Sequence, residues 1–255
     1  SIIILASAAC GGPSNDKVAV RITHGPILGR LSSHEIGIWA RTSQPGAFQV
    51  LYGTAPEKLD RTSQPISTRL EHDNSNWVHL DGLKSNTKYY YRLRTSSDHQ
   101  GLGGSFRTLP NPDDFRHSDL NPQGLFNFGF EFACGNNQDP RQGLGPSVPA
   151  FKTMLDQLRD KIYFAIQNGD WLYEDRRDFS PDQWVKQVKI SSDDIPSVVQ
   201  YAPTITGVWE NYKVYLERGE NLAAWHREVP SFFTFDDHEI LNDTYGAGSA
   251  GLRNR

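Results

Sequence analysis

The chain has 255 residues, which is enough for one large domain or two smaller ones with a real hydrophobic core. Its net charge of −4 and its sequence pI near 6.1 leave no basic footprint for nucleic acid or anionic lipid. The only cysteines are Cys10 and Cys134. A disulfide between them would have to join an N-terminal tail to a predicted strand end, and we do not expect one.

Residues 1–17 are interpreted as a signal-peptide remnant and linker, because residues 1–13 form an apolar run that closes in small residues, which is typical of the back half of a secretory signal. The run is too short to span a bilayer. Cys10 follows Ala8 and Ala9, a pattern that suggests a bacterial lipoprotein cleavage site with a lipid anchor on the cysteine. We therefore expect a secreted, periplasmic or cell-surface protein. The alternative is that these residues form a frayed N-terminal strand of the mature protein.

Residues 18–109 read as an all-β domain. Short segments with period-two alternation, Val18–Ile22, Ile36–Ala40 and Phe48–Tyr52, are separated by Gly, Pro and Ser clusters. Further along, Leu83, a turn, Thr87 and Tyr89 lead into another alternating strand, which resembles the tyrosine corner of immunoglobulin-like and fibronectin III-like sandwiches. We predict such a sandwich. No cluster of potential ligands occurs within it, so we interpret it as a spacer or a support for a lid.

A proline-bearing linker over residues 110–124 separates this domain from residues 125–255. In the second region the sequence pattern predicts strands that alternate with helices. That alternation predicts parallel strands, whose carboxyl ends meet at one edge of the sheet. Three apolar helical stripes are expected: one on Ala150, Met154, Leu155 and Leu158, one that begins after the cap Ser180, and one on Trp209, Tyr212, Leu216, Ala223 and His226.

Three predicted strands of this second region run directly into potential metal ligands. The segments 126–133, 162–166 and 232–235 are read as buried strands, and they are followed by Cys134, Asp170 and Asp237. Carboxylates packed at the ends of buried strands repel one another, and a cation offsets that repulsion. The sequence therefore predicts one composite metal site at the carboxyl edge of a βαβ sheet.

The motifs that carry this pattern resemble those of the PhoD-type alkaline phosphatases and phosphodiesterases, within the calcineurin-like metallophosphatase superfamily. The matching segments are Phe132-Ala133-Cys134, Gly169-Asp170-Trp171-Leu172-Tyr173-Glu174 and Phe235-Asp236-Asp237-His238-Glu239. An N-terminal immunoglobulin-like domain and an export signal match that family too.

The resemblance implies a dinuclear iron–calcium site. Cys134, Tyr173 and Asp170 would bind a ferric ion, and Asp170 would bridge to calcium, whose shell would include Asp237. His238 matches the position of an imidazole near the scissile phosphate. A phenolate and carboxylates suit a hard trivalent ion, and carboxylate oxygens suit calcium.

Other polar residues near these motifs are expected to have supporting or structural roles. Asp236 and Asn242 are expected to support the ligands rather than bind the metal, while Asn136 and Asn137 shape the loop. We interpret Glu239 as a solvated carboxylate of a first helical turn and His226 as a helix histidine with its hydrogen bonds satisfied. Gln167 stands where the resembling family often carries His, which could alter a contact on the phosphate side.

The function implied is an exported hydrolase of phosphate mono- or diesters. Metallophosphatases of this kind take further histidines from later strands, whereas no His, Asp, Glu or Cys follows Asp243. We therefore read the sequence as an N-terminal fragment with a truncated catalytic domain. One rival is a catalytically silent exported binding or adhesion protein. Another is a metal-free thiol hydrolase with Cys134 as nucleophile and His238 as base.

Overall fold

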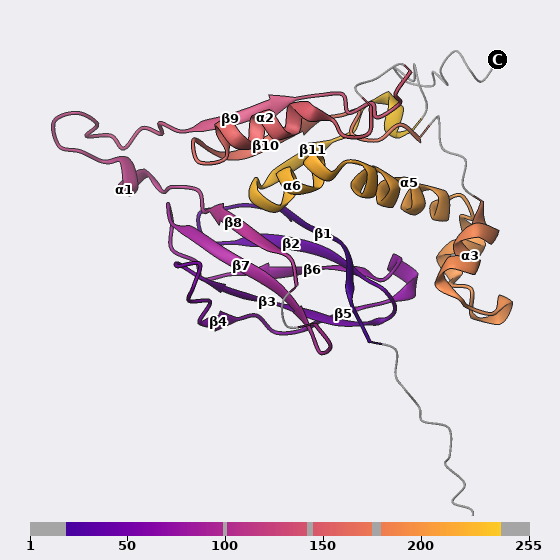
Figure 1. Ribbon diagram of the computed structural model, residues 1–255. Helices are drawn as coiled ribbons and strands as arrows, with labels where there is room; N and C mark the ends of the chain where they lie inside the picture. Colours follow the sequence, from indigo (N-terminus) through magenta and orange to yellow (C-terminus); the bar gives the residue numbers. More distant parts are fainter. Residues whose placement is uncertain (1–18, 99–100, 142–144, 175–179, 241–255) are drawn as a thin grey trace, which may run out of the picture.

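The computed structural model describes residues 19–98, 101–141, 145–174 and 180–240. A β-sandwich forms one lobe, and a three-stranded sheet with its helices forms the other (Figure 1). Helices α5 and α6 lie between the sandwich and that sheet. The predicted signal remnant at residues 1–17, with Cys10, and the predicted supporting residue Asn242 fall outside the described residues.

Two antiparallel sheets make up the first lobe, in the orders β1-β2-β6 and β4-β3-β7-β8, with β5 paired to β3. The strands are β1 Ile22–Gly29, β2 Ile36–Thr42, β3 Gly46–Gly53, β4 Arg61–Thr62, β5 Ile66–Thr68, β6 Ser75–Leu80, β7 Lys88–Thr95 and β8 Gly103–Arg107; a short 3-10 helix, η1, spans Leu70–His72. The first strand begins at Ile22, and the predicted start at Val18 lies outside the described residues. The strands predicted from Ile36 and around Phe48–Tyr52 are present.

Apolar side chains at alternate positions of the strands form the sandwich core, as the sequence predicts. Side chains one residue apart point to opposite faces, and Ile36, Ile38 and Ala40 of β2 are fully buried between the sheets. Tyr89 is buried at the start of β7, and its hydroxyl accepts a hydrogen bond from the backbone N–H of Lys84 at 2.9 Å. This bond ties the turn before β7 to the strand, the role expected of a tyrosine corner.

The second lobe is a parallel sheet in the order β11-β10-β9, with β10 in the centre. Its strands are β9 Gly129–Ala133, β10 Ile162–Asn168 and β11 Ser231–Thr234, and its helices are α2 Pro149–Leu158, α3 Pro181–Val188, α4 Ser197–Tyr201, α5 Ile205–Arg218 and α6 Glu220–Glu228, with short 3-10 helices η3 Ser192–Asp194 and η4 Asp237–Glu239. Right-handed crossovers between strands taken in this sequential order place α2 and α6 on the same face of the sheet.

The opposite face of this sheet is open within the described residues, which corrects the prediction of buried strands. Phe130 is 51% exposed, Phe132 60% and Phe232 37%. The rings of Phe130 and Phe232 pack on Phe164, each with its centroid 5.3 Å from that of Phe164. The apolar runs were read correctly as strands, but the burial of both faces was inferred from composition alone and is wrong.

Two further details of the helices differ from expectation. The stripe from Trp209 to His226 is divided between α5 and α6 at Gly219, where a Cβ would lie 2.7 Å from the carbonyl oxygen of Tyr215. The linker 110–124 contains a short helix, α1 Pro112–Phe115.

The helix predicted after Ser180 is present as α3, and the Gln183 side chain accepts from the Ser180 backbone N–H at 2.8 Å.

The two lobes are joined by a buried network of charged groups around Asp73. The Arg41 guanidinium donates two hydrogen bonds to this carboxylate, at 2.9 and 3.0 Å, and the Lys213 ammonium on α5 lies 3.1 Å from it. The indole N–H of Trp184 on α3 also donates to Asp73, at 3.0 Å, and Glu210 pairs with Lys213. Burial alone would raise the pKa of Asp73, but the hydrogen bonds and charge of Arg41, with Lys213, hold that pKa below its usual value.

Other contacts extend this interface along α6 and β8. The hydroxyl of Tyr91 donates to the carbonyl oxygen of Arg227 at 2.9 Å, and the Glu228 carboxylate accepts from the N–H and the hydroxyl of Ser105. At Gly104 an added Cβ would stand 2.2 Å from the carbonyl oxygen of Arg227, so only glycine permits this approach of the helix to the strand.

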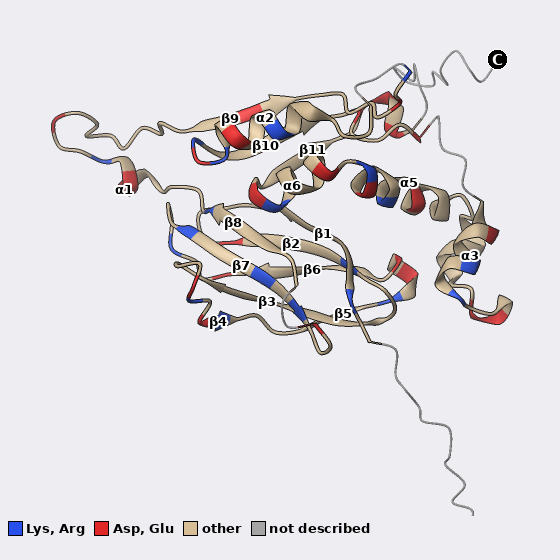
Figure 2. Cartoon of the chain, in the orientation of Figure 1, with Lys and Arg blue, Asp and Glu red and all other residues tan. Residues whose placement is uncertain are grey.

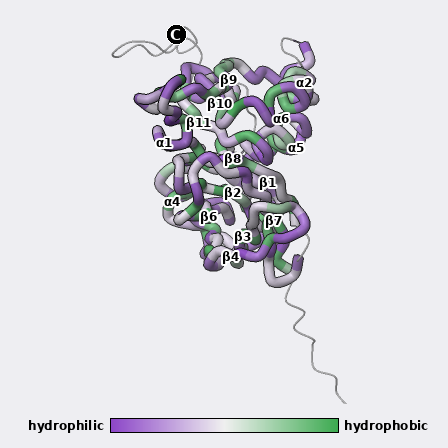
Figure 3. Tube along the Cα trace, turned by 90° about the vertical axis from the view of Figure 1, so that its left-hand side faces the viewer, coloured by the Kyte–Doolittle hydropathy of each residue, from purple (hydrophilic) through white to green (hydrophobic). Residues whose placement is uncertain are grey.

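The distribution of charge and hydropathy follows this architecture. Acidic residues gather in the segment after β11, whereas neither charge dominates a whole lobe (Figure 2). Seen from the side, the two lobes are stacked with α5 and α6 close to the junction (Figure 3). Among the residues described, no helix has the length and hydropathy needed to cross a membrane.

We expect Asp73→Asn to lower the free energy of unfolding by about 3–5 kcal/mol, because Arg41 and Lys213 would then be buried without their shared anion. Denaturant unfolding at neutral pH measures the change. The matched control is Asp156→Asn, which removes an exposed i,i+4 partner of Lys152 and should cost less than about 1 kcal/mol. Equal losses in the two variants would contradict a supporting role for the buried network.

Candidate metal centre

Three loops meet at the carboxyl edge of the parallel sheet, as the sequence predicts. They follow β9, β10 and β11 and carry Cys134, Asp170 and Asp237. The first two are joined by a hydrogen bond from the backbone N–H of Asn136 to the carbonyl oxygen of Asp170 at 2.8 Å. Parallel pairing of the strands brings the loops to one edge, and this bond then fixes their spacing.

The turn that presents Asp170 has an unusual backbone. Gly169 and Asp170 have φ angles of +82° and +52°, both in the left-handed region. A Cβ at position 169 would stand 2.4 Å from the Cβ of Asp236, so glycine is required for the loops after β10 and β11 to approach. Asp tolerates the left-handed conformation better than most residues, although it still carries strain that the surroundings must hold.

Glu239 supplies that support. Its carboxylate accepts backbone N–H bonds from Asp170 at 3.0 Å, Leu172 at 3.0 Å and Asp236 at 2.7 Å. The interpretation of Glu239 as a solvated carboxylate is therefore wrong. The missed signal is its spacing from Asp236, because Asp-x-x-Glu is the pattern of a capping box. Here the same acceptor reaches beyond its own turn and clamps the loop after β10.

Asp170, Asp237 and His238 form the cluster that the structure brings together. Each offers one ligand atom, and these atoms all lie within 4.8 Å of one another. Burial raises the pKa of Asp170, and the charges of Asp237, Glu239 and Asp236 raise it further, while His238 acts in the opposite direction. Tyr173 is buried beside this cluster, with its ring centroid 4.2 Å from that of His238.

The remaining predicted site residues take different positions. Cys134 is exposed and free in the first loop, and its sulfur is not part of the 4.8 Å group. Asp236 caps η4, since its side chain accepts from the backbone N–H of Asp237 at 2.9 Å. Asn136 is buried and donates to the carbonyl oxygen of Trp171 at 3.3 Å, which fits a residue that shapes the loop.

The residues present fit a bound cation. Oδ1 of Asp170 is buried and has no hydrogen-bond partner among the described residues. A buried carboxylate oxygen without a partner is costly, and a metal ion would satisfy it. The second carboxylate and the imidazole of the cluster are ordinary ligand types for such an ion.

His226 supports the site from behind, as predicted for a helix histidine with satisfied hydrogen bonds. The indole N–H of Trp171 donates to Nε2 of His226 at 3.0 Å, so this nitrogen is the acceptor. Nδ1 then carries the proton and donates to the hydroxyl of Ser231 at 3.2 Å. Complete burial lowers the pKa of His226 to about 3, so the ring is neutral at physiological pH.

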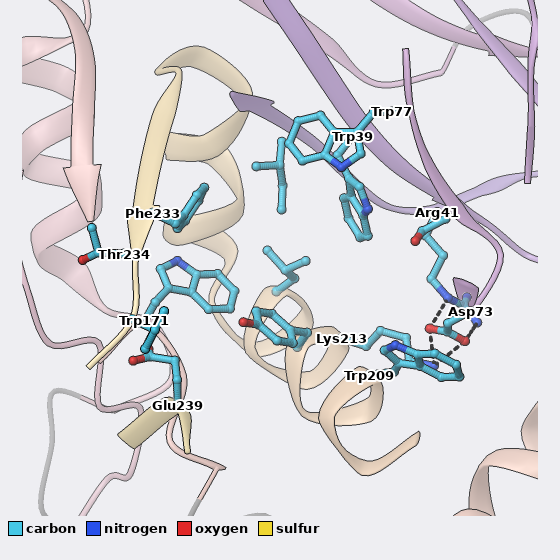
Figure 4. A pocket seen from close by; sticks show the side chains of 15 residues that line it. Trp39, Arg41, Asp73, Trp77, Trp171, Trp209, Lys213, Phe233, Thr234 and Glu239 are labelled. Carbon is cyan, nitrogen blue, oxygen red and sulfur yellow. Dashed lines mark hydrogen bonds and ion pairs between the residues drawn. The ribbon is translucent and has the colours of Figure 1, made fainter. Parts of the chain in front are cut away.

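Sequence reasoning also missed a pocket in which the sandwich takes part. Trp39 and Trp77 on the outer face of the β1-β2-β6 sheet line it together with Trp209 and Tyr212 of α5, and Glu239 forms part of its wall (Figure 4). The interpretation of the sandwich as a spacer without any part in a site is thus incomplete. The available signal was a pair of tryptophans, Trp39 and Trp77, at strand positions that alternate with the residues of the sandwich core.

Residues 128–254 match the PhoD-like phosphatase family, and residues 29–108 match the N-terminal domain of purple acid phosphatases. The chain is 26% identical over 239 residues to alkaline phosphatase D of Bacillus subtilis (strain 168), covering 92% of this chain and 35% of that protein. It is 25% identical over 215 residues to phosphoenolpyruvate phosphatase of Allium cepa, covering 78% and 40%.

A solved structure of PhoD shares the fold, with a TM-score of 0.58, 21% identity and coverage of 85% of this chain and 39% of that one. This likeness shows the fold, a two-lobed arrangement with a sandwich before an α/β region. Residues 128–254 match the PhoD-like phosphatases, and the comparisons together support a phosphatase of the PhoD type. It spans 35–40% of the length of the two curated relatives.

The neutral state of His226 makes stability depend on pH. The folded protein binds a proton at this ring only near pH 3, whereas the unfolded chain binds it near pH 6.5. Stability should therefore fall as the pH decreases below 6.5, by about 2 kcal/mol at pH 5 from this group. Denaturant unfolding at pH 7 and pH 5 tests this. In His226→Gln that part of the loss should vanish, and in the exposed His72→Gln it should remain.

The clamp by Glu239 can be tested by amide hydrogen exchange. We expect Glu239→Ala to speed exchange at the Asp170 and Leu172 amides by roughly 10- to 100-fold, because each loses a hydrogen bond to a charged acceptor. Glu220→Ala, at an exposed carboxylate in the first turn of α6, should leave these amides unchanged. Unaltered protection in Glu239→Ala would show that the loop is held by other contacts.

Proposed function

We propose that the protein hydrolyses phosphate mono- or diesters at a metal centre built around Asp170. The observation that carries this proposal is the meeting of Asp170, Asp237 and His238 within 4.8 Å at the carboxyl edge of a parallel sheet. The match of residues 128–254 to the PhoD-like phosphatases supports this reaction class. The relatives named above are called phosphatases, and their activity is extended to this chain as part of the proposal.

We further propose a dinuclear centre of ferric iron and calcium. Asp170, Tyr173 and Cys134 would hold the iron, and Asp170 and Asp237 the calcium. The bond between Asn136 and Asp170 supports this assignment, because it places the loop of Cys134 against that of Asp170. When bound, the two cations would supply Lewis-acid activation of water and of the phosphoryl group.

The protein's own residues would divide the remaining work. Asp170 and Asp237 would bind the cations and fix their positions. The carboxylate of Glu239 keeps the strained turn at Asp170 in place. His238 would donate a proton to the leaving oxygen of the ester, a role worth roughly 10²–10⁴-fold in rate. Its contact with the ring of Tyr173 restrains the direction of the imidazole.

The wider organisation completes the proposal. Residues 18–109 and 125–255 would form two domains joined by the linker 110–124, and the first would be an immunoglobulin- or fibronectin III-like sandwich, which the bond of Tyr89 supports. Residues 1–17 would be the remnant of an export signal, with Cys10 as the site of a lipid anchor, so that the enzyme acts outside the cytoplasm.

Hydrolysis of a phosphate diester at alkaline pH, with and without a chelator, tests the function. We expect chelation to abolish turnover. Asp170→Asn should cost more activity than Asp237→Asn, because a bridging carboxylate serves both cations. The exposed Asp113→Asn is the control and should behave as the parent protein. Near-native turnover by Asp170→Asn would overturn the proposal.

The same measurements separate the alternatives. A silent binding protein would give no turnover even after loading with both metals. A thiol hydrolase would keep its activity in chelator and lose it in Cys134→Ser. For the iron itself, a phenolate ligand predicts a coloured protein, and Tyr173→Phe should bleach that colour while preserving the fold. Iron-free protein from an iron-replete culture would remove the iron assignment.

A further inference from the structure

The space between the two lobes holds a pocket of about 470 Å³, which we call the interdomain pocket. Its aromatic walls are Trp39 and Trp77 from the sandwich, Trp209 and Tyr212 from α5, and Phe233 and Phe235 from β11 and its end. Ligand pockets for small molecules have volumes of roughly 300–1,000 Å³ and are mostly apolar with a few polar groups. The interdomain pocket meets both conditions.

The sandwich wall of the pocket is rigid. Trp39 and Trp77 are cross-strand partners on β2 and β6, and their side chains share one face of the sheet. The indole of Trp77 lies over Gly37 and Gly29, where a Cβ would come within 3.0 and 3.2 Å of its ring atoms. The guanidinium of Arg30 lies 5.0 Å from the centre of the same ring. The indole is therefore fixed in place before any ligand arrives.

The charged groups of the pocket favour an uncharged occupant. Arg41 and Lys213 line one end, but both are paired with Asp73, and Lys213 also with Glu210 (Figure 4). The positive charges of Arg41 and Lys213 are balanced by the negative charges of Asp73 and Glu210. Glu239 lines the other end with its oxygens committed to backbone N–H groups. Because the charged side chains are already satisfied, a sugar or an ion would find few partners, whereas an apolar ring needs none.

The pocket adjoins the candidate metal centre, because residues next to the cluster in the chain form part of its wall. Thr234 and Phe235 line it, and the same segment continues into Asp237 and His238. Trp171 lines it too, directly after Asp170 in the chain. Glu239 belongs to both, since it forms pocket wall and clamps the turn of Asp170. A group bonded to a phosphate at the cluster can thus extend into the pocket.

We propose that the interdomain pocket binds the organic part of the substrate and that this part is a neutral, flat, aromatic ring. The proposal rests on the proposed function for the phosphate end, while ring binding itself requires no turnover. It makes the sandwich a contributor to substrate selection, because two of the stacking indoles belong to it.

Calorimetric titration with p-cresol, a neutral aromatic alcohol, tests binding without any chemistry. We expect saturable binding by the whole protein and weaker binding of cyclohexanol, which is apolar but not flat. Trp77→Ala should weaken p-cresol binding about tenfold through loss of one stacking wall. Ser75→Phe, which fills the pocket from the sheet side, should abolish it. Tyr201→Ala removes an aromatic side chain that is 89% exposed and should change nothing.

Kinetics with two diesters that share the 4-nitrophenyl leaving group provide the second arm. The phenyl diester should have a lower KM than the methyl diester, and Trp77→Ala or Ser75→Phe should raise KM for the phenyl diester alone. Turnover with equal KM values and no p-cresol binding would overturn the ring site but keep the phosphatase. Binding of p-cresol that Ser75→Phe abolishes, without turnover of either ester, would keep the ring site and overturn the proposed function.

Discussion

The docking of α5 and α6 onto the outer face of the β1-β2-β6 sheet is the contact on which the rest of the structure depends. The sheet buries its inner face in the sandwich core, and its outer face receives the helices. Asp73 is central to this contact because it gathers Arg41 from the sandwich, Lys213 from α5 and Trp184 from α3. Removal of any partner would leave a charge or a polar group buried and unsatisfied.

The architecture of the candidate metal centre could be predicted from the sequence to a large extent. Short apolar runs that end in Cys134, Asp170 and Asp237 already implied parallel strands with their ligands at one edge, and the loops do meet there. The prediction of ligands at one sheet edge succeeds because the order of strands and helices and the side chains at each strand end can be read from local sequence. The metals, and the roles of Tyr173 and His238, stay predictions.

Burial and cross-loop contacts could not be predicted in the same way. Phe132 and Phe232 were read as buried, yet they face away from α2 and α6, since the side taken by a crossover is a property of the whole sheet. Glu239 was read as solvated because its partners Asp170 and Leu172 are far from it in sequence. The part of Trp39 and Trp77 in a pocket could not be predicted, because the pocket forms only where helix α5 packs opposite them.

The strained turn at Gly169 and Asp170 links these observations to function. The chain adopts two consecutive left-handed residues there, and they are held by the Glu239 carboxylate on one neighbouring loop and by the backbone N–H of Asn136 on the other. Such an arrangement fixes the direction of the Asp170 side chain before any ligand binds, which is the condition for a preorganised centre. The same carboxylate borders the aromatic pocket, so the two candidate sites share one wall.

The shared interface also constrains how this protein can change over evolutionary time. Gly104 admits the backbone of Arg227, and Tyr91 and Ser105 bond to α6, so the sandwich surface is matched to one particular helix. A sandwich transplanted from another protein would meet α6 with side chains where glycine is required and would leave Lys213 without its anion. The two lobes are therefore not interchangeable modules, and substitutions on either side of the junction are expected to have been inherited in compensating pairs.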